Sequence, residues 1–242
     1  MRDSLRHFVA EFVGVFAYVF VGGAALMMTQ GPGSLITVAV AHGLILAVMI
    51  TATMRVSGHL NPAVTIGFLV TRRIQPMMAG VYLVAQIIGG MVAAYALKLV
   101  VPAAVFVATR GGGHSVALDV TTGQAFLIEM LVTFFLVFVV FGSAADPQSP
   151  KIGGLAIGFA ATANIAAFGP LTGASMNPAR AFGPAVASGV YEGQAIYWLG
   201  PIVGGIIAAV LYDQLFLPRD PELPGSGAVQ PQPGRAKREH AL

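Results

Sequence analysis

The chain alternates between long apolar runs and short polar connections, and six of the runs are long enough to cross a bilayer. About 20 residues of helix, rising 1.5 Å each, cross a hydrocarbon core of about 30 Å. The third run also has room for a re-entering loop. The runs are residues 8–28, 35–54, 77–107, 124–142, 152–171 and 195–212. This pattern predicts an all-α membrane protein with six transmembrane helices.

Two further apolar segments, residues 62–70 and 178–188, are only about half as long as a span. Backbone that stops at membrane depth is tolerated where protein buries it or where it lines a water-filled cavity. The alternative, an amphipathic surface loop, is disfavoured because residues 62–70 have no polar face. We therefore expect two half-helices.

The sequence contains an internal repeat. Asn61-Pro62-Ala63 recurs 116 residues later as Asn177-Pro178-Ala179, and Glu11 in the first span recurs 118 residues later as Glu129 in the fourth. Each copy then holds three spans and one half-helix, and an odd number of spans inserts the second copy upside down. The spacing predicts an inverted 3+3 repeat, in which short interrupted helices meet near the midplane.

The repeat divides the chain into three parts. Residues 1–7 form an N-terminal segment, and residues 8–217 form the membrane domain, with repeat one at about 8–107 and repeat two at about 124–217. Residues 218–242 are rich in proline, glycine and charge, which is typical of a disordered extension.

The repeated triplets have a chemistry of their own. Asparagine is a preferred N-cap and proline is a preferred first helical residue, so each triplet predicts the start of a helix. Helix N-termini carry partial positive charge and unpaired N–H donors. If two starts face each other, the amides of Asn61 and Asn177 donate into a pore, orient water there and oppose protons and cations. The alternative is that both asparagines only cap their helices.

Composition narrows the class of protein. Hydrophobic residues make up 56% of the chain and charged residues 10%, against roughly 25% charged in soluble domains. The chain has no cysteine, so thiolate and disulfide chemistry are excluded. No serine–histidine–acid set, metal cluster or phosphate-binding loop is recognisable, so we expect neither an enzyme nor a cofactor. Nucleic acid is not an expected partner.

Basic residues predict the orientation. With six spans, ten basic residues fall on the side of the termini and three on the other, which places both termini in the cytoplasm. The ten are Arg2, Arg6, Arg55, Arg72, Arg73, Lys151, Arg219, Arg235, Lys237 and Arg238, and the three are Lys98, Arg110 and Arg180. We expect a cell membrane (plasma or inner), with a vacuolar membrane as the alternative.

Residues 57–65 and 173–180 resemble the signature loops of aquaporins, and the likeness extends over about residues 8–217. Residues 41–43, 114–116, 144–147 and 163–165 are most similar to those of plant tonoplast aquaporins. One departure is that a single residue separates Ser57 from His59 where the family usually has two. The resemblance implies a homotetramer with one pore per subunit.

The resemblance also implies a narrow selectivity filter. Carried over residue by residue, it comprises His42, Ile165, Ala174 and Arg180, with His114 as a candidate fifth member. Arg180 is permanently charged and donates in a fixed fork, so it would bind water and repel cations. Competing roles are a salt bridge or headgroup contact for Arg180 and a core position for His42. We expect His59 to brace the first loop.

Single acids inside spans need partners. Glu11 and Glu129 could relay protons, as in a transporter, or each could accept donors from the loop of its own half. Their symmetric placement beside the two triplets favours bracing, as the family resemblance also implies.

The permeating solute follows from a few positions. Glycerol-conducting relatives typically carry an aspartate and a basic residue where this chain has Ala181 and Ala185. We therefore expect a passive water channel that excludes protons and ions, with ammonia as a second permeant. Alternatives are a facilitator of glycerol or urea, a proton-coupled transporter and a membrane scaffold that transports nothing.

Overall fold

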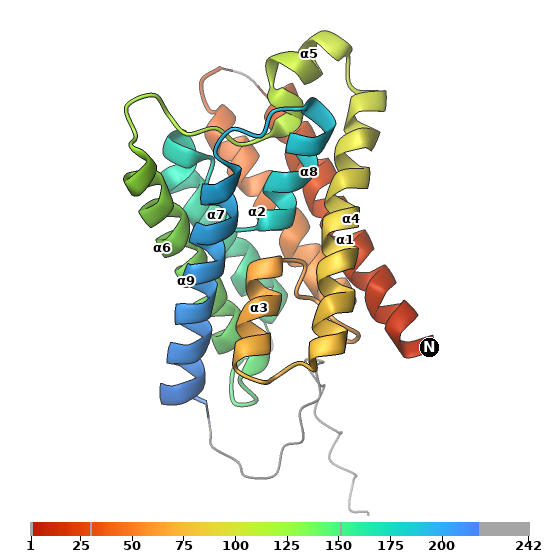
Figure 1. The fold of residues 1–242 in the computed structure, drawn as a ribbon, viewed down its shortest axis with the longest axis vertical. Coiled ribbons are helices and arrows are strands. Elements are labelled where there is room, and N and C mark those ends of the chain that lie inside the picture. The colour runs from red at the N-terminus through yellow and green to blue at the C-terminus, as the bar shows by residue number, and fades with distance from the viewer. Residues whose placement is uncertain (1, 30, 151, 218–242) are drawn as a thin grey trace, which may run out of the picture.

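The structure is a computed structural model that describes residues 2–29, 31–150 and 152–217. Within these residues it has six helices long and apolar enough to span a membrane, as predicted (Figure 1). They are α1 (Arg2–Met28), α2 (Ser34–Thr53), α4 (Pro76–Val100), α6 (Thr122–Val140), α7 (Gly153–Thr172) and α9 (Gln194–Leu215). The predicted tail, 218–242, lies outside the described residues.

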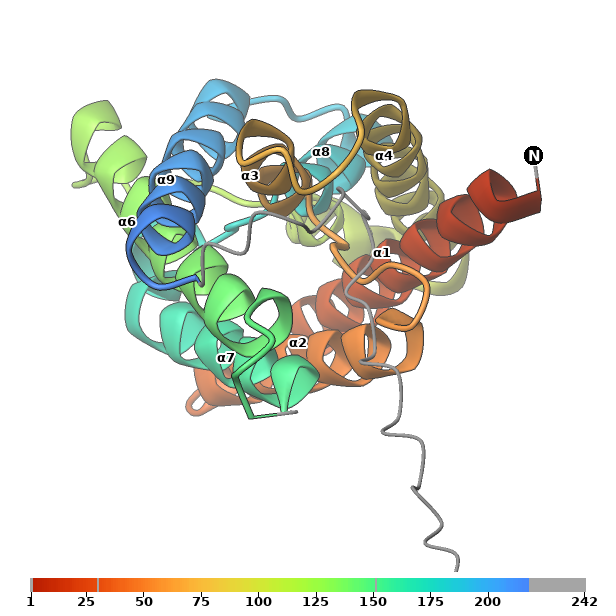
Figure 2. The ribbon, with the colours of Figure 1, turned by 90° about the horizontal axis from the view of Figure 1, so that it is seen from below.

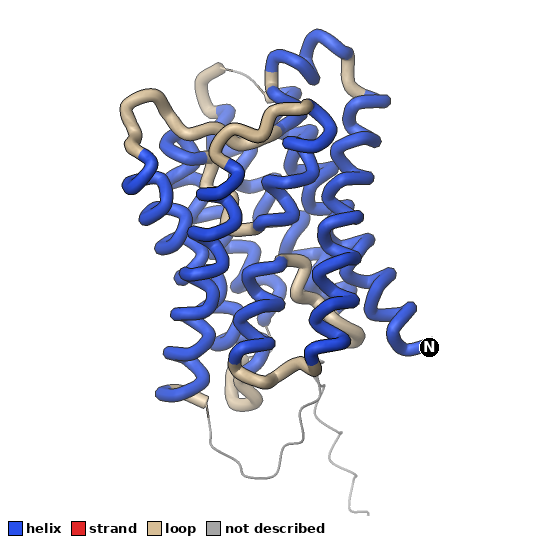
Figure 3. Tube along the Cα trace, viewed as in Figure 1, coloured by secondary structure: helices blue, strands red, loops and turns tan. Residues whose placement is uncertain are grey.

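Two short helices lie inside the bundle. They are α3 (Pro62–Val70) and α8 (Pro178–Ser188), which match the two predicted half-helices. Figure 3 shows that loops gather at the two ends of the bundle and just before these helices. The fold is therefore six spans and two half-helices, and no strand occurs in the parts of the chain that the structure describes.

Two boundaries differ from the sequence expectation. Helix α1 begins at Arg2, so the described part of the N-terminal segment is the start of the first helix. Helix α4 ends at Val100, and the rest of the third apolar run forms the short α5 (Ala103–Ala108) at the upper end of the bundle rather than a re-entering loop (Figure 1). The short 3-10 helix η1 (Arg110–Gly112) and the π-helical segment η2 (Phe141–Ala145), which directly follows α6, complete the element order.

Glycines allow the long helices to pack closely. Helix α1 packs on α4, α6 on α9, and α2 on α7. A Cβ at Gly158 of α7 would overlap the carbonyl oxygen of Gly43 in α2, and one at Gly204 of α9 would overlap that of Met130 in α6. Such small residues let helix backbones approach in a membrane, where no hydrophobic force draws helices together.

The two repeats interlock through their half-helices. Helix α3 of repeat one packs mainly on α9 of repeat two, and α8 of repeat two packs mainly on α4 of repeat one. Seen from below, α3 and α8 lie between α9 and α4 (Figure 2). This exchange brings the N-terminal ends of both half-helices to the middle of the bundle.

Candidate pore and selectivity site

Asn61 and Asn177 cap the two half-helices. The Asn61 Oδ1 accepts from the backbone N–H of Ala63 at 2.9 Å, and the Asn177 Oδ1 accepts from those of Ala179 at 3.0 Å and Arg180 at 3.3 Å. A proline follows each asparagine at the first helical position, where no N–H is needed. Each triplet thus starts a helix whose positive end faces the middle of the protein.

The same two asparagines join the repeats. The Asn61 Nδ2 donates to the carbonyl of Met176 at 2.8 Å, and the Asn177 Nδ2 donates to the carbonyl of Leu60 at 2.8 Å. Each acceptor is therefore the residue just before the other asparagine. A primary amide has two N–H groups, so each side chain uses one hydrogen across the interface and keeps one.

Leu60 and Met176 have left-handed backbones, with φ of 49° and 56°. Such a conformation is unfavourable for residues with a side chain and persists only where its surroundings support it. Here each residue is supported by its own buried carboxylate, which accepts a hydrogen bond from the backbone N–H of that residue.

Glu11 supplies that carboxylate in repeat one. Its Oε1 accepts the N–H groups of Gly58 at 3.0 Å and His59 at 2.9 Å, and its Oε2 accepts the N–H of Leu60 at 2.7 Å. The Gln86 Nε2 donates to Oε2 at 2.7 Å. Glu11 is fully buried, and these four donors offset the loss of water around its charge.

Glu129 occupies the matching place in repeat two. Its Oε1 accepts from the Thr172 hydroxyl at 2.7 Å and from the Ser175 N–H at 2.9 Å, and its Oε2 accepts from the Met176 N–H at 3.0 Å. Thr172 thus takes the part that Gln86 plays in repeat one. Sequence reasoning missed both residues, because their positions do not correspond in the repeat.

His59 lies in the network around Gln86. The Gln86 Nε2 also donates to the Thr65 hydroxyl at 2.9 Å, and the His59 Nδ1 lies 3.2 Å from that hydroxyl. The imidazole packs edge-on against Tyr82, with ring centroids 4.9 Å apart. The His59 side chain therefore contacts α3 through Thr65 and α4 through Tyr82.

A narrow cavity lies beside the two asparagines, which form part of its lining. The space open to water is ≈ 10 Å³, about what one water molecule requires. Its polar lining comes from Asn61, Asn177, His59 and Tyr18, and its apolar lining from Leu46, Ile50, Val64, Leu136, Val140 and Ile157. A mostly apolar cavity of this size with a few polar groups suits a single water-sized molecule.

Arg180 and His42 contact each other directly. The Arg180 Nη2 lies 3.1 Å from the His42 Nε2, and its Nη1 donates to the carbonyls of Ala174 and Ser175 at 3.2 Å each. The His42 Nδ1 lies 2.8 Å from the carbonyl of Val38. Arg180 is 4% exposed, and its Nε has no partner among the described residues.

The remaining predicted filter residues occupy different elements. Ile165 on α7 is buried, and Ala174 lies in the loop before α8 with a φ of 43°. Sequence reasoning missed Tyr18 and Gly22 of α1. The Arg180 guanidinium lies 5.8 Å from the centre of the Tyr18 ring, and a Cβ at Gly22 would overlap the His42 ring.

His114 is buried in the loop that follows η1. Its ring lies 5.2 Å from that of Tyr197, and a Cβ at Gly173 would approach its Cδ2 to 2.8 Å. Neither ring nitrogen has a partner among the described residues. Burial lowers the pKa of His114 well below its ordinary value, and the charge of Arg180 and the proximity of His42 lower it further. The imidazole is therefore neutral near pH 7.

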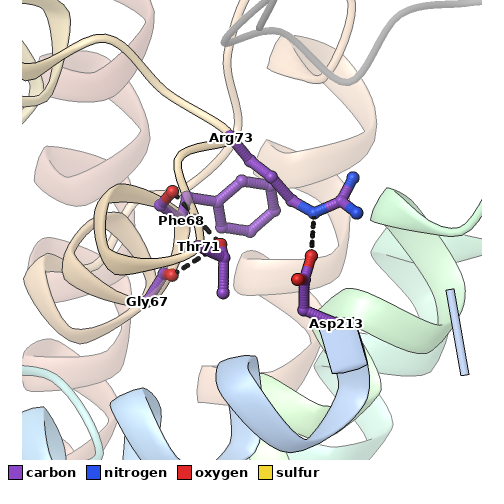
Figure 4. A network of polar contacts seen from close by, with 5 residues as sticks. All are labelled: Gly67, Phe68, Thr71, Arg73 and Asp213. Carbon is purple, nitrogen blue, oxygen red and sulfur yellow. Dashed lines mark hydrogen bonds and ion pairs between the residues drawn. The ribbon is translucent and has the colours of Figure 1, made fainter. Parts of the chain in front are cut away.

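The lower end of the bundle carries an ion pair. The Arg73 Nε donates to the Asp213 carboxylate and so connects the loop after α3 to the end of α9 (Figure 4). The Thr71 hydroxyl donates to the carbonyl of Gly67 at 2.9 Å in the last turn of α3. In residues 2–29, 31–150 and 152–217, no three histidine, aspartate or glutamate side chains gather as a metal site.

The fold and the site define a multi-pass membrane channel. The family described as Major intrinsic protein matches residues 1–212. The chain is 40% identical to "Probable aquaporin TIP3-2" of Arabidopsis thaliana, over 95% of this chain and 90% of that protein. It is also 40% identical to "Aquaporin TIP1-2" of Zea mays, over 93% and 92% of the two chains.

A solved structure has the same fold. It is the X-ray structure of the aquaglyceroporin from Plasmodium falciparum, which superimposes with a TM-score of 0.75, covers 88% of this chain and 96% of that one, and is 24% identical. The chain belongs to the major intrinsic protein (aquaporin) family. It is accordingly a channel and not an enzyme.

Proposed function

We propose that this chain is a passive water channel that excludes protons and other ions. The observation that carries the proposal is the pair Asn61 and Asn177, which begin facing half-helices and each keep one amide hydrogen after the cross-bonds to Met176 and Leu60. A water molecule between them accepts from both amides, so its own hydrogens point away.

This arrangement accounts for the exclusion of protons. Water molecules on either side of the central one orient in opposite directions, so the file lacks the uniform hydrogen-bond chain along which a proton hops. The positive ends of α3 and α8 oppose cations at the same point. The buried guanidinium of Arg180 adds a second positive barrier.

Glu11 and Glu129 brace the two loops in this proposal and do not relay protons. Both oxygens of each carboxylate accept hydrogen bonds from loop or helix donors of the same repeat. Neither carboxylate is among the residues that line the cavity. A proton carrier needs contact with water on both sides, which this bonding does not favour.

Ammonia is the second permeant we propose. The proposed filter is His42, Ile165, Ala174 and Arg180, with His114 as a fifth member. The support is that neither ring nitrogen of the buried His114 has a hydrogen-bond partner among the described residues, so both can bond to a small polar solute. Glycerol and urea are larger, and no comparable feature of this chain favours them.

We also propose the assembly and the orientation of the channel. The chain forms a homotetramer in a lipid bilayer, with one pore per subunit. The bilayer is a cell membrane or, alternatively, a vacuolar membrane, and both termini lie on its cytoplasmic side. The excess of basic residues at the predicted cytoplasmic end supports this orientation.

Stopped-flow light scattering on proteoliposomes tests the proposal. An impermeant osmolyte should shrink vesicles with the wild-type chain much faster than empty ones, and Asn177→Asp, which places a carboxylate against the Leu60 carbonyl, should abolish the difference. Gly80→Ala is the matched control, because a Cβ there meets nothing within 4 Å. An ammonium gradient with an internal pH dye should show faster alkalinisation. Wild-type shrinkage no faster than that of empty vesicles would contradict the proposal.

A further inference from the structure

The chain has three asparagines, and all three meet at Met176. Asn61 donates to the Met176 carbonyl at 2.8 Å, and Asn177 is the next residue along the chain. The third, Asn164 on α7, donates through Nδ2 to the Met176 Sδ at 3.2 Å and to the carbonyl of Val132 at 2.9 Å. Sequence reasoning assigned no role to Asn164, and the proposed function does not use it.

Both hydrogens of the Asn164 amide have an acceptor. One N–H serves the Val132 carbonyl of α6, and the other serves the thioether, which is a weak acceptor. A polar side chain within a membrane span is costly and usually has a specific partner. The partners of Asn164 connect α6, α7 and the loop before α8.

Met176 is thereby held at three points. Its N–H donates to Glu129 at 3.0 Å, its carbonyl accepts from Asn61, and its sulfur accepts from Asn164. The residue is fully buried with a φ of 56°. This backbone conformation depends on its surroundings. A change at the Met176 side chain therefore shifts the Met176 carbonyl oxygen, which is only two bonds from the Cα that carries the side chain.

Repeat one handles the corresponding residue differently. The Leu60 N–H donates to Glu11 at 2.7 Å and its carbonyl accepts from Asn177 at 2.8 Å, which matches Met176. Its side chain is apolar, however, and occupies the space beside Gly14. The sulfur-to-amide contact therefore belongs to repeat two and has no equivalent at Leu60.

We propose that Asn164 is a positioning residue of the pore, which holds the Met176 side chain and so fixes the carbonyl that receives the Asn61 amide. The direction of that bond sets the direction of the second Asn61 N–H, the one offered to water. This inference rests on the proposed water-channel function.

A double-mutant cycle tests the inference. Met176→Leu installs the residue that repeat one has at this point, with similar volume, and so removes the sulfur acceptor at little cost in packing. Asn164→Ala removes the amide. Each single variant should lower the water permeability per channel about threefold and raise the proton leak, and the double variant should be no worse than either, because coupled residues are not additive.

Thr162→Ala is the matched control on the same helix, since the Thr162 hydroxyl donates to its own helix at the Gly158 carbonyl, 3.0 Å away. It should leave both permeabilities unchanged. A side chain that only stabilises the fold would change the melting temperature and the yield, but not the permeability per folded channel or the ratio of water to proton flux.

Met176→Leu keeps the test decisive if Asn164→Ala fails to fold. Wild-type permeability in Met176→Leu, or additive losses in the double variant, would overturn the positioning role while leaving the water channel intact. Wild-type vesicles no more permeable than bare lipid would instead overturn the channel itself.

Discussion

Arg180 and His42 lie 138 positions apart in the chain and share a hydrogen bond 3.1 Å long between Nη2 and Nε2. A guanidinium can only donate, so the His42 Nε2 must accept. The hydrogen of the neutral ring is then on Nδ1, where the Val38 carbonyl receives it at 2.8 Å. This pair therefore fixes the ring of His42 and one arm of Arg180 together.

Gly22→Ala tests whether the position of His42 controls the pore. A Cβ at Gly22 would overlap the His42 ring, which Val38 and Arg180 hold from two sides. Overpacking of this kind costs about 1–3 kcal/mol. We expect lower water permeability per channel in stopped-flow measurements. Gly80→Ala, a helical glycine with open space beside it, should conduct normally, and equal behaviour of the two variants would argue against a controlling role.

Glu129→Gln should destabilise the protein strongly. The carboxylate accepts three donors, whereas a glutamine offers one acceptor oxygen and turns N–H groups toward the Ser175 or Met176 N–H. Buried donors left without a partner cost about 1–3 kcal/mol, so the melting temperature in detergent should drop markedly. Thr172→Val removes only one of the donors and should have the smaller effect. If Glu129→Gln melted like the wild type, the bracing role would be wrong.

The lowered pKa of His114 predicts how stability depends on pH. The unfolded imidazole takes up a proton below about pH 6.5, whereas in the folded protein burial, Arg180 and His42 keep His114 neutral. The contribution of neutral His114 to the stability of the folded protein is therefore fully present above about pH 6.5 and is lost as the pH falls below that value. His114→Asn cannot titrate, so its melting temperature should fall less than that of the wild type between about pH 7.5 and about pH 5.5. Parallel curves for the two proteins would contradict the prediction.

Asp213→Asn should weaken the connection between α3 and α9. Arg73 and Asp213 are 32% and 23% exposed, so solvent screens the pair, and we expect a loss of about 0.5–1 kcal/mol that shrinks as salt is added. Asp3→Asn is the control, because the Asp3 side chain is 83% exposed and 3.7 Å from Arg6. Thermal unfolding at low and high salt measures both, and a salt-independent loss would point to packing instead of charge.

The sequence by itself determined the architecture. A membrane accepts only apolar segments of a certain length, so six spans and two half-length helices could be read from the apolar runs. The recurrence of Asn61 as Asn177 and of Glu11 as Glu129 gave the inverted repeat. The ends were harder to predict, because hydropathy does not register that α1 begins at Arg2 or that α5 is a separate helix.

Only the tertiary structure decided how the site is connected. Nothing in the local sequence indicates three features of the site. They are the bond from Asn61 to Met176, the different donors that Gln86 and Thr172 supply, and the burial of His114. The bond from Asn61 to Met176 depends on how α3 and α8 exchange places between the repeats, whereas Gln86 and Thr172 each bond to the glutamate of their own repeat. A hydrogen bond requires two groups within about 3 Å and correctly aligned. For residues that lie 43 to 115 positions apart, that geometry is set by the packing of the helices.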